Sequence, residues 1–248
     1  MSLLLNVMPL ETLVTLIVIL LGSVETWIFT SRRKREKLQR AAADSLRRVE
    51  QNLIAVAADN NWELTMRPSS ALWYRIFGRG PDGVRWEIAE GAPRVENGVI
   101  RTSGARWNTD AVRAPYRLVE LLPRGLYDRM KRAATAGAWD AAWSISCRKL
   151  VLEGFEVALR HPRLAEHIIA VALAPALAER LLADETEEAL ARLETDELRV
   201  SLGFPNLRIS TDLGASTPEI LKSMVDAGVL LARRYHRSVP TTAVRFAA

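Results

Sequence analysis

The sequence predicts an α+β protein with one N-terminal transmembrane helix, a helical neck and a cytoplasmic domain that holds an antiparallel β meander followed by helices and a β-hairpin. Three observations predict this fold. An apolar run covers Leu13 to Phe29, a basic cluster follows it, and short alternating apolar segments begin at Trp62. With 248 residues, of which 49% are hydrophobic and 25% are charged, the chain is long and apolar enough to fold around a core.

The apolar run of 17 residues contains a single charge, that of Glu25. A helix of this length spans about 26 Å, and flanking residues extend it to roughly the 30 Å of a hydrocarbon core. A cleaved signal peptide would carry positive charges before its apolar run, whereas no Lys or Arg precedes Leu13. We therefore expect residues 1–30 to form a transmembrane anchor with a very short outer N-terminus.

The basic cluster between Ser31 and Arg48 sets the expected orientation. It holds eight Lys and Arg residues against two acidic ones, a local charge of +6 beside +5 for the whole chain. Basic flanks stay in the cytoplasm, so we expect residues 31–60 to form a juxtamembrane helix and residues 61–248 a cytoplasmic domain at the inner membrane. The predicted interfacial anchor consists of Trp27, Arg32, Arg33, Lys34, Arg35 and Lys37. These cations either attract anionic lipid headgroups, by about 1 kcal/mol each, or act as a topology signal alone.

Glu25 is the costly residue of the predicted span, because an ionisable side chain at the middle of a membrane helix costs about 2.5–3.5 kcal/mol. It lies near the end of the run, where its side chain can extend toward the interface. The alternative is a polar face of small residues that contacts another membrane helix. That predicted face consists of Gly22, Ser23, Glu25 and Thr26.

A helical apolar stripe continues beyond the basic cluster. It consists of Leu38, Ala42, Leu46, Val49, Leu53 and Val56. We expect the stripe to pack on the protein's own domain, although its spacing also suits a neighbouring protein. Residues 59–61, Asp-Asn-Asn, predict the end of this helix.

The stretch "GRGPDG", Gly78 to Gly83, matches the G-x-G-x-x-G pattern of nucleotide-binding loops. A dinucleotide site needs a helix that begins at these glycines, but strand-type segments flank them on both sides. A kinase loop needs a lysine strand, an H-R-D loop and a D-F-G element, and the sequence contains none of these. Because Pro-Asp-Gly is typical of turns, the stretch predicts a hairpin turn.

The remaining segments predict the order of elements in the domain. Strand-type segments cover 62–67, 72–77, 84–90, 98–102, 116–122 and 154–160, and a hairpin joins 197–202 to 207–211. Helices are predicted at 124–137, across 162–193 with a break or kink at Pro175, and from a Thr217 cap onward. A soft change in composition near residues 135–150 indicates a candidate subdivision of the domain.

Few residues suggest catalysis. Cys147, the only cysteine, stands beside Arg148 and Lys149, which would lower the pKa of its thiol if their charges reached the sulfur, yet an inert, half-buried cysteine is expected. His161 and His167 are six residues apart, which does not place them on one metal-binding helix face, so capping and surface roles are expected. The acidic stretch 184–197 lacks the spacing of a calcium loop and indicates a solvated face or a docking site for a basic partner. We expect no catalytic residue, cofactor or metal.

Tryptophan is abundant, with seven in the chain, and core packing is expected to account for most of them. Trp73 and Trp86 are expected to lie on facing strands. Aromatic and basic residues alternate at 106–117, but residues 61–248 carry a net charge of only +3. We therefore expect solvent-facing arginines rather than a nucleic-acid surface.

Three functions remain, in order of preference. The first is a non-catalytic accessory or structural subunit that stabilises or assembles a multi-subunit cytoplasmic-membrane complex of bacterial type. The second is a membrane-tethered module that binds or senses a ligand or peptide, which a pocket lined by tryptophans would favour. The third is an enzyme, which would need perturbed titratable groups that converge in a cleft.

The layout resembles that of the H subunit of purple-bacterial reaction centres, which also has a single N-terminal span and a cytoplasmic β-rich domain. The resemblance concerns architecture and extends to no motif. It implies a complex of photosynthetic or respiratory type and transfers no residue role.

Overall fold

The computed structural model describes residues 10–96, 99–101, 103–112, 114, 117–138, 145–203, 206–212 and 218–238, with the backbone alone for 10–28 and for a few residues at element ends. Two compact units make up the chain. The first is Met1–Arg48 with Arg94–Arg101, and the second is Val49–Pro93 with Thr102–Ala248. The second unit contains the main sheet and the helices that pack on it.

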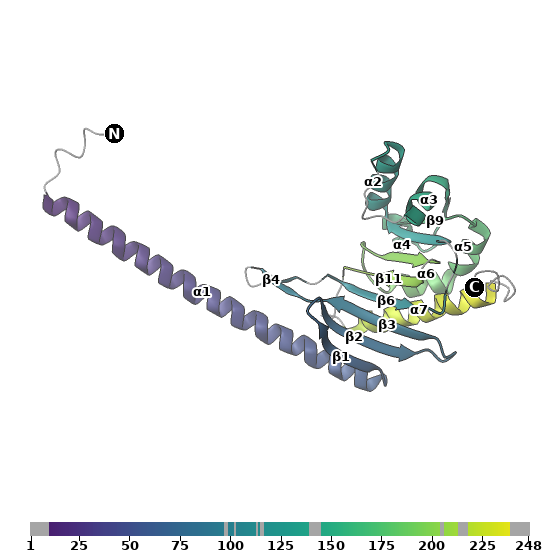
Figure 1. The fold of residues 1–248 in the computed structure, drawn as a ribbon, viewed down its shortest axis with the longest axis horizontal. Coiled ribbons are helices and arrows are strands. Elements are labelled where there is room, and N and C mark those ends of the chain that lie inside the picture. The colour runs from purple at the N-terminus through teal and green to yellow at the C-terminus, as the bar shows by residue number, and fades with distance from the viewer. Residues whose placement is uncertain are drawn as a thin grey trace. The chain divides into compact units, whose positions relative to one another are not determined.

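Helix α1, Leu10–Asp59, is unbroken over 50 residues (Figure 1). It ends at the predicted place, because Asn61 adopts the left-handed conformation with φ of 54° and the backbone N–H of Trp62 donates to the carbonyl of Ala57 at 2.8 Å. Leu53 and Ala57 are buried. The expected packing of the stripe on the protein's own domain is therefore confirmed at its C-terminal end.

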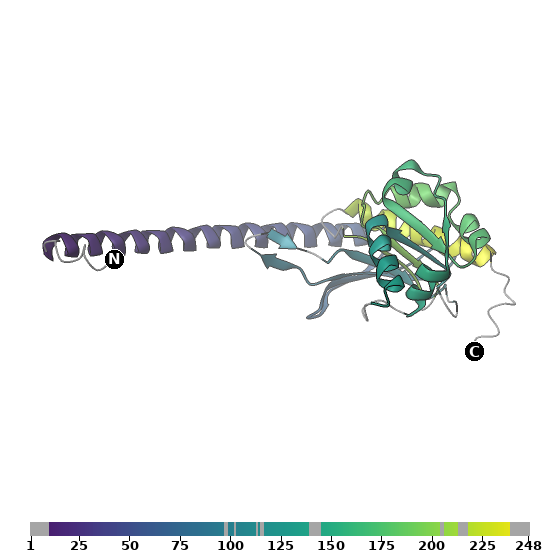
Figure 2. The same cartoon turned by 90° about the horizontal axis from the view of Figure 1, so that it is seen from above.

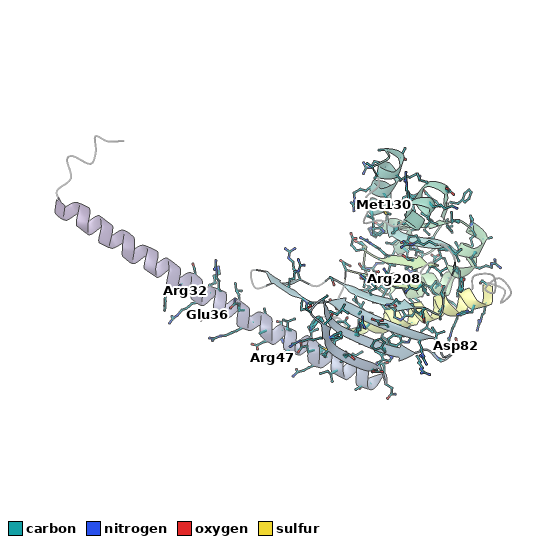
Figure 3. The ribbon with its side chains drawn as sticks, viewed as in Figure 1. Arg32, Glu36, Arg47, Asp82, Met130 and Arg208 are labelled. Atoms are coloured by element: carbon teal, nitrogen blue, oxygen red, sulfur yellow. The ribbon has the colours of Figure 1, made fainter. Side chains whose placement is uncertain are left out.

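Among the residues whose side chains are described, no helix is both long enough and apolar enough to cross a membrane. The side chains of the predicted helix-contacting face, Gly22, Ser23, Glu25 and Thr26, and that of Trp27 lie outside the described residues. The basic side chains at 32–37 are exposed, and Figure 3 labels Arg32 in this part of α1. The Arg33 guanidinium carbon lies 4.5 Å from the centroid of the Phe29 ring.

The second unit is built on one antiparallel sheet of nine strands, which confirms the predicted α+β class. Its strands are β1 (Glu63–Ser69), β2 (Leu72–Arg79), β3 (Arg85–Gly91), β6 (Ala105–Thr109), β7 (Val119–Pro123), β8 (Phe155–Val157), β9 (Ile168–Ala172), β10 (Arg199–Leu202) and β11 (Leu207–Ser210). Their order across the sheet is β1-β2-β3-β6-β11-β10-β7-β9-β8 (Figure 1). In the first unit, β4 (Arg94–Glu96) and β5 (Val99–Arg101) form a separate pair.

The order of strands corrects one expectation. The predicted meander holds for β1, β2 and β3 but does not extend to β7, because the C-terminal hairpin β10–β11 lies between β6 and β7. It lies inside the same sheet, where β11 pairs with β6 and β10 pairs with β7. Hydrogen bonding to both neighbours leaves neither strand of the hairpin with an open edge.

The "GRGPDG" stretch forms the predicted hairpin turn between β2 and β3. The backbone N–H of Gly83 donates to the carbonyl of Gly80 at 2.9 Å, and Gly83 has φ of 76°. Asp82 in this turn, labelled in Figure 3, forms an ion pair with Arg233 of α7 (Pro218–Ser238). The nucleotide-loop alternative is therefore excluded, because the glycines connect two strands rather than opening a helix.

Strand register separates an apolar face of the sheet from a polar one. A row of directly paired, buried residues crosses eight strands, namely Ile76, Ile88, Trp107, Ile209, Val200, Leu121, Ala170 and Val157. One residue along each strand, the opposite face carries Glu87, Asn108, Arg208, Ser201 and Glu120 in the same order. Because side chains alternate along a strand, one register sets both faces.

Helices cover the two faces unequally. On the apolar face α7 packs on β6 and β11, where the Trp107 ring fills the space beside Gly228, and α5 (Pro175–Leu181) packs on β9. Helix α6 (Asp184–Ala191) packs on α7 and on the short α4 (Pro162–His167). On the polar face, α2 (Arg124–Thr135) and α3 (Ile145–Glu153) cover β7 and β9 only. Among the described residues, α2 and α3 show no comparable packing on β10, β11 or β6. Figure 2 shows the same fold turned by 90°.

One local prediction was wrong, and two others were correct only in part. Residues 168–172, predicted as helix, form strand β9, because a strand buried on both faces is an unbroken apolar run that periodicity does not distinguish from a helix. Pro175 begins α5 rather than kinking a longer helix. Trp73 and Trp86 lie on facing strands, as predicted, but at opposite ends of the hairpin, and Trp86 stands opposite Gly78.

Candidate binding cleft

A cleft of about 450 Å³ lies on the polar face of the sheet, between residues of α2 and α3 and those of β6, β7, β10 and β11. Its charged lining consists of Arg106, Arg117, Arg199, Arg208, Glu120, Glu197 and Asp212. Its hydroxyl lining consists of Ser103, Ser201, Ser210 and Thr211, and its apolar wall of Leu122, Leu126 and Met130 with Cys147. Figure 3 labels Met130 on α2 and Arg208 on β11.

Sheet register places the polar side chains of the cleft on one face. Ser201 of β10 stands opposite Glu120 of β7 on one side and opposite Arg208 of β11 on the other. Two residues away, Ser210 stands opposite both Arg199 and Arg106. Each of these residues alternates along its strand with one of the buried apolar residues that are paired across the sheet. Packing of these apolar residues in the core therefore fixes where the polar side chains lie.

Glu120 is the buried acid of the cleft, with its side chain only 5% exposed. Its Oε1 accepts hydrogen bonds from Arg117 Nη1 at 3.0 Å and from Ser201 Oγ at 2.7 Å. Among the described residues, its buried Oε2 has no hydrogen-bond partner. Burial raises the pKa of Glu120 above its ordinary value, while Arg117, Ser201 and Arg208 partly oppose the rise.

Glu120→Gln is expected to reduce the dependence of unfolding free energy on pH. Because the folded-state pKa is raised, the native protein holds a proton that the unfolded chain has released, so stability is greatest below the ordinary pKa of 4.5 and falls as pH rises toward the raised value. Glutamine keeps an acceptor oxygen and does not ionise. Urea unfolding from about pH 4.5 to about pH 8 should show a smaller loss of stability in the variant than in the wild type. Glu156→Gln, at a side chain that is 54% exposed, is the control, and equal slopes in wild type and E120Q would contradict the prediction.

The four arginines of the cleft differ in how far nearby acidic side chains neutralise their charges. Arg117 pairs with Glu120 at 3.0 Å, and Arg199 lies 4.0 Å from Glu197. Arg106 and Arg208 form no ion pair with another described residue. Burial lowers the pKa of Arg208, and the neighbouring charges of Arg106 and Arg117 add to the effect. The cleft therefore holds guanidinium groups close together with incomplete neutralisation.

Cys147 faces the apolar cluster under α2 and α3 and is buried rather than half-buried. Arg148 and Lys149 are exposed. Burial, followed by the nearby charge of Glu120, raises the pKa of the Cys147 thiol to about 12. The thiol therefore stays protonated at neutral pH, which agrees with the expected inert cysteine and disfavours a nucleophilic role.

The histidines and the acidic stretch, apart from Glu197, do not line the cleft. His161 occupies the N-cap position of α4, and its Nε2 lies 3.8 Å from Glu188. Glu187 differs from the expected solvated face, because it is buried and accepts backbone hydrogen bonds from Arg160 at 2.7 Å and His161 at 2.6 Å. Within the described part of the chain, no group of three or more His, Cys, Asp or Glu side chains has the arrangement of a metal site.

Most of the cleft residues are not those that the sequence singled out, the exceptions being Cys147 and, within the stretch 106–117, Arg106 and Arg117. The predicted interfacial cations at 32–37 belong to the first unit and are not among the residues that line the cleft. Arg106, Arg199 and Arg208 each precede an apolar core residue, a pattern that predicts only a solvent-facing arginine on a strand. Their convergence, together with Arg117 and Glu120, depends on which strands pair, and no local pattern encodes that pairing.

Comparison with known proteins gives little further guidance. No protein-family model matches the chain, and neither does any curated protein. Among solved structures, the crystal structure of the mycobacterial trehalose monomycolate transport factor A, TtfA, is similar at a TM-score of 0.43 and 10% identity, over 77% of this chain and 96% of that chain. A similarity this low assigns no function.

Proposed function

We propose that this protein is a non-catalytic accessory or structural subunit of a multi-subunit cytoplasmic-membrane complex, anchored by one membrane helix. The observation that carries the proposal is α1, a single helix of 50 residues that is apolar at 13–29, basic at 32–40 and buried in the core of the second unit at Leu53. This order of segments suits an anchor that joins a cytoplasmic domain without a linker.

The proposal also assigns orientation and partners. The N-terminus lies outside, the domain lies in the cytoplasm, and the basic residues at 32–37 lie near anionic headgroups. Other membrane subunits, rather than nucleic acid, are the partners. The architectural resemblance to a reaction-centre subunit makes photosynthetic and respiratory complexes the first candidates.

Exposed apolar side chains on α1 support contact with another protein. Phe29 and Ile54 are each 55% exposed and Leu38 is 38% exposed, and only Leu152 and Phe155 join them as large exposed apolar side chains in the described part of the chain. Most of the large apolar side chains left uncovered are therefore on α1. A helix that presents such groups suits a neighbouring subunit or lipid.

The protonated Cys147 thiol supports a non-catalytic role. A nucleophilic or general-base mechanism requires an activated group within hydrogen-bond reach of a substrate. In this proposal the domain therefore binds a partner or ligand and does not catalyse a reaction.

A membrane-tethered binding module is the second candidate, and the cleft favours it. Of the tryptophans, Trp73 and Trp107 are buried in the core, whereas Trp62 and Trp86 line a separate cavity of about 520 Å³. The cleft instead offers arginine and serine side chains to a ligand. Polar groups that converge in a concave site are typical of ligand binding.

Isolation from native membranes tests the accessory-subunit role. The full chain, tagged at its C-terminus, is purified after gentle solubilisation, and the mass and composition of the particle are measured. Stable membrane subunits in fixed stoichiometry are expected. A lone monomer or homodimer would contradict the role and leave the tethered binding module.

Glu25→Leu tests which part of the chain holds the partners. If the face formed by Gly22, Ser23, Glu25 and Thr26 contacts another helix, this substitution should release partner subunits in detergent. Glu36→Leu makes the same change in the exposed basic part of α1 and is the matched control. An unchanged particle in E25L would show that this face is not the contact.

A further inference from the structure

We propose that the cleft on the polar face of the sheet binds a doubly charged phosphate group, held mainly by Arg106 and Arg208. This site goes beyond the accessory-subunit role and does not depend on it. A phosphate monoester carries a charge of about −1.5 to −2 and three strong acceptor oxygens, which suits guanidinium and hydroxyl donors.

Strand register brings the two arginines together. Arg106 on β6 stands opposite Ser210 on β11, and Asn108 on β6 stands opposite Arg208 on β11. The two arginines are therefore diagonal neighbours on one face of adjacent strands, a separation that long side chains bridge. Arg106 is exposed and Arg208 is half-buried, and both line the cleft.

The charges of this pair are only partly neutralised within the described residues. Glu120 and Glu197 pair with Arg117 and Arg199, although the charge of Glu120 also favours the charged form of Arg208. Asp212 accepts hydrogen bonds from the neutral hydroxyls of Thr195 and Thr211 and keeps its negative charge at the rim. Two like charges held side by side near a buried surface repel each other, and a bound anion removes that repulsion.

Unused donors support a ligand rather than a merely solvated surface. The Nε–H groups of Arg117 and Arg208 have no acceptor among the described residues, and because they are closed to solvent, a phosphate meets them only after the side chains reorient. Ser103 Oγ accepts the backbone N–H of Gly91 at 3.0 Å, which leaves its hydroxyl proton to donate elsewhere. A cleft of about 450 Å³ accommodates a phosphate group together with part of the molecule that carries it.

The charge balance favours phosphate over carboxylate. A carboxylate has one negative charge and two oxygens, so it would neutralise one of the two unpaired arginines and leave the other. A phosphate group pairs with both arginines and also accepts a hydrogen bond from a serine hydroxyl. We therefore expect phosphate to bind more tightly than acetate.

Isothermal titration of the full chain in a zwitterionic detergent tests the site with inorganic phosphate, acetate and soluble dihexanoyl phosphatidic acid. Saturable binding of phosphate is expected, with acetate weaker. If the short-chain phosphatidic acid binds more tightly than phosphate and competes with it, the natural source is a lipid headgroup. If the two bind equally, the source is a free phosphate or a soluble ester.

Two double variants distinguish phosphate binding at this site from a general effect of positive charge on the protein. R106A/R208A should weaken phosphate binding at least about tenfold, because it removes both unpaired cations. R79A/R85A is the matched control, since Arg79 and Arg85 are a directly paired, exposed couple on the same strand face and do not line the cleft. The control should change the affinity by less than about twofold.

Defined results would overturn the proposal. These are the absence of saturable binding by phosphate and phosphatidic acid, equal weakening in both double variants, or binding of acetate as tight as that of phosphate. If R106A/R208A does not fold, R106A alone removes an exposed side chain and must still weaken phosphate binding.

Discussion

Replacing Trp107 with Ala is expected to lower the free energy of unfolding by about 3–5 kcal/mol, because it removes the largest side chain of the core row. Trp107 is 0% exposed and stands between Ile88 and Ile209 in the centre of the sheet. A Cβ atom at Gly228 of α7 would lie 2.6 Å from atoms of the indole ring. Because α7 has no side chain at that contact, nothing on the helix can fill the cavity.

Urea unfolding of the full chain in a mild detergent, followed by far-UV circular dichroism, measures this loss. Trp62→Ala is the control. The Trp62 ring is partly exposed and contacts Trp86 edge-on at 5.1 Å between centroids, so its removal should cost about 1 kcal/mol. Equal losses in W107A and W62A would contradict the central position of Trp107 in the core.

Gly104→Ala is expected to destabilise the domain by about 3 kcal/mol or more, through overpacking combined with backbone strain. Gly104 has φ of 76°, and a Cβ there would lie 1.9 Å from the carbonyl oxygen of Thr211. The contact is with backbone that is itself fixed, since the N–H of Thr211 donates to the carbonyl of Ala105 at 3.1 Å. The start of β6 or the end of β11 would have to move, and both border the cleft.

Gly83→Ala separates strain from contact. Gly83 also has φ of 76°, but a Cβ there would meet nothing within 4 Å. Only the left-handed conformation then opposes the side chain, at about 1–2 kcal/mol. The difference between the unfolding free energies of G104A and G83A in urea then measures the cost of the close contact with Thr211. Similar values for the two variants would show that the approach of Thr211 does not constrain Gly104.

Local features were predictable where the cause is local. The turn at Gly78–Gly83 follows from Pro-Asp-Gly chemistry, and the end of α1 follows from the Asn residues that tolerate the left-handed conformation. The pairing of β2 with β3 and of β10 with β11 follows from short connections between alternating segments. In each case the interacting residues are close in sequence.

Features that depend on tertiary packing were harder to predict from the sequence. Strand β9 was assigned to a helix because five buried apolar residues have no period. Cys147 was expected to be half-buried, but it is buried under α2 and α3, whereas Arg148 and Lys149, its neighbours in sequence, are exposed. A side chain's environment depends on what packs over it, which neighbours along the chain do not determine.

The local sequence thus specified the helical course of the N-terminal half of α1, its end, both hairpins and the alternation of apolar with basic residues in the strands. Tertiary structure decided the cleft. Arg106, Glu120 and Arg208 come from strands β6, β7 and β11, and they share one surface because β10 and β11 insert between β6 and β7. Alternation tells which side of its own strand a residue occupies, but only pairing between distant strands tells which residues stand beside it.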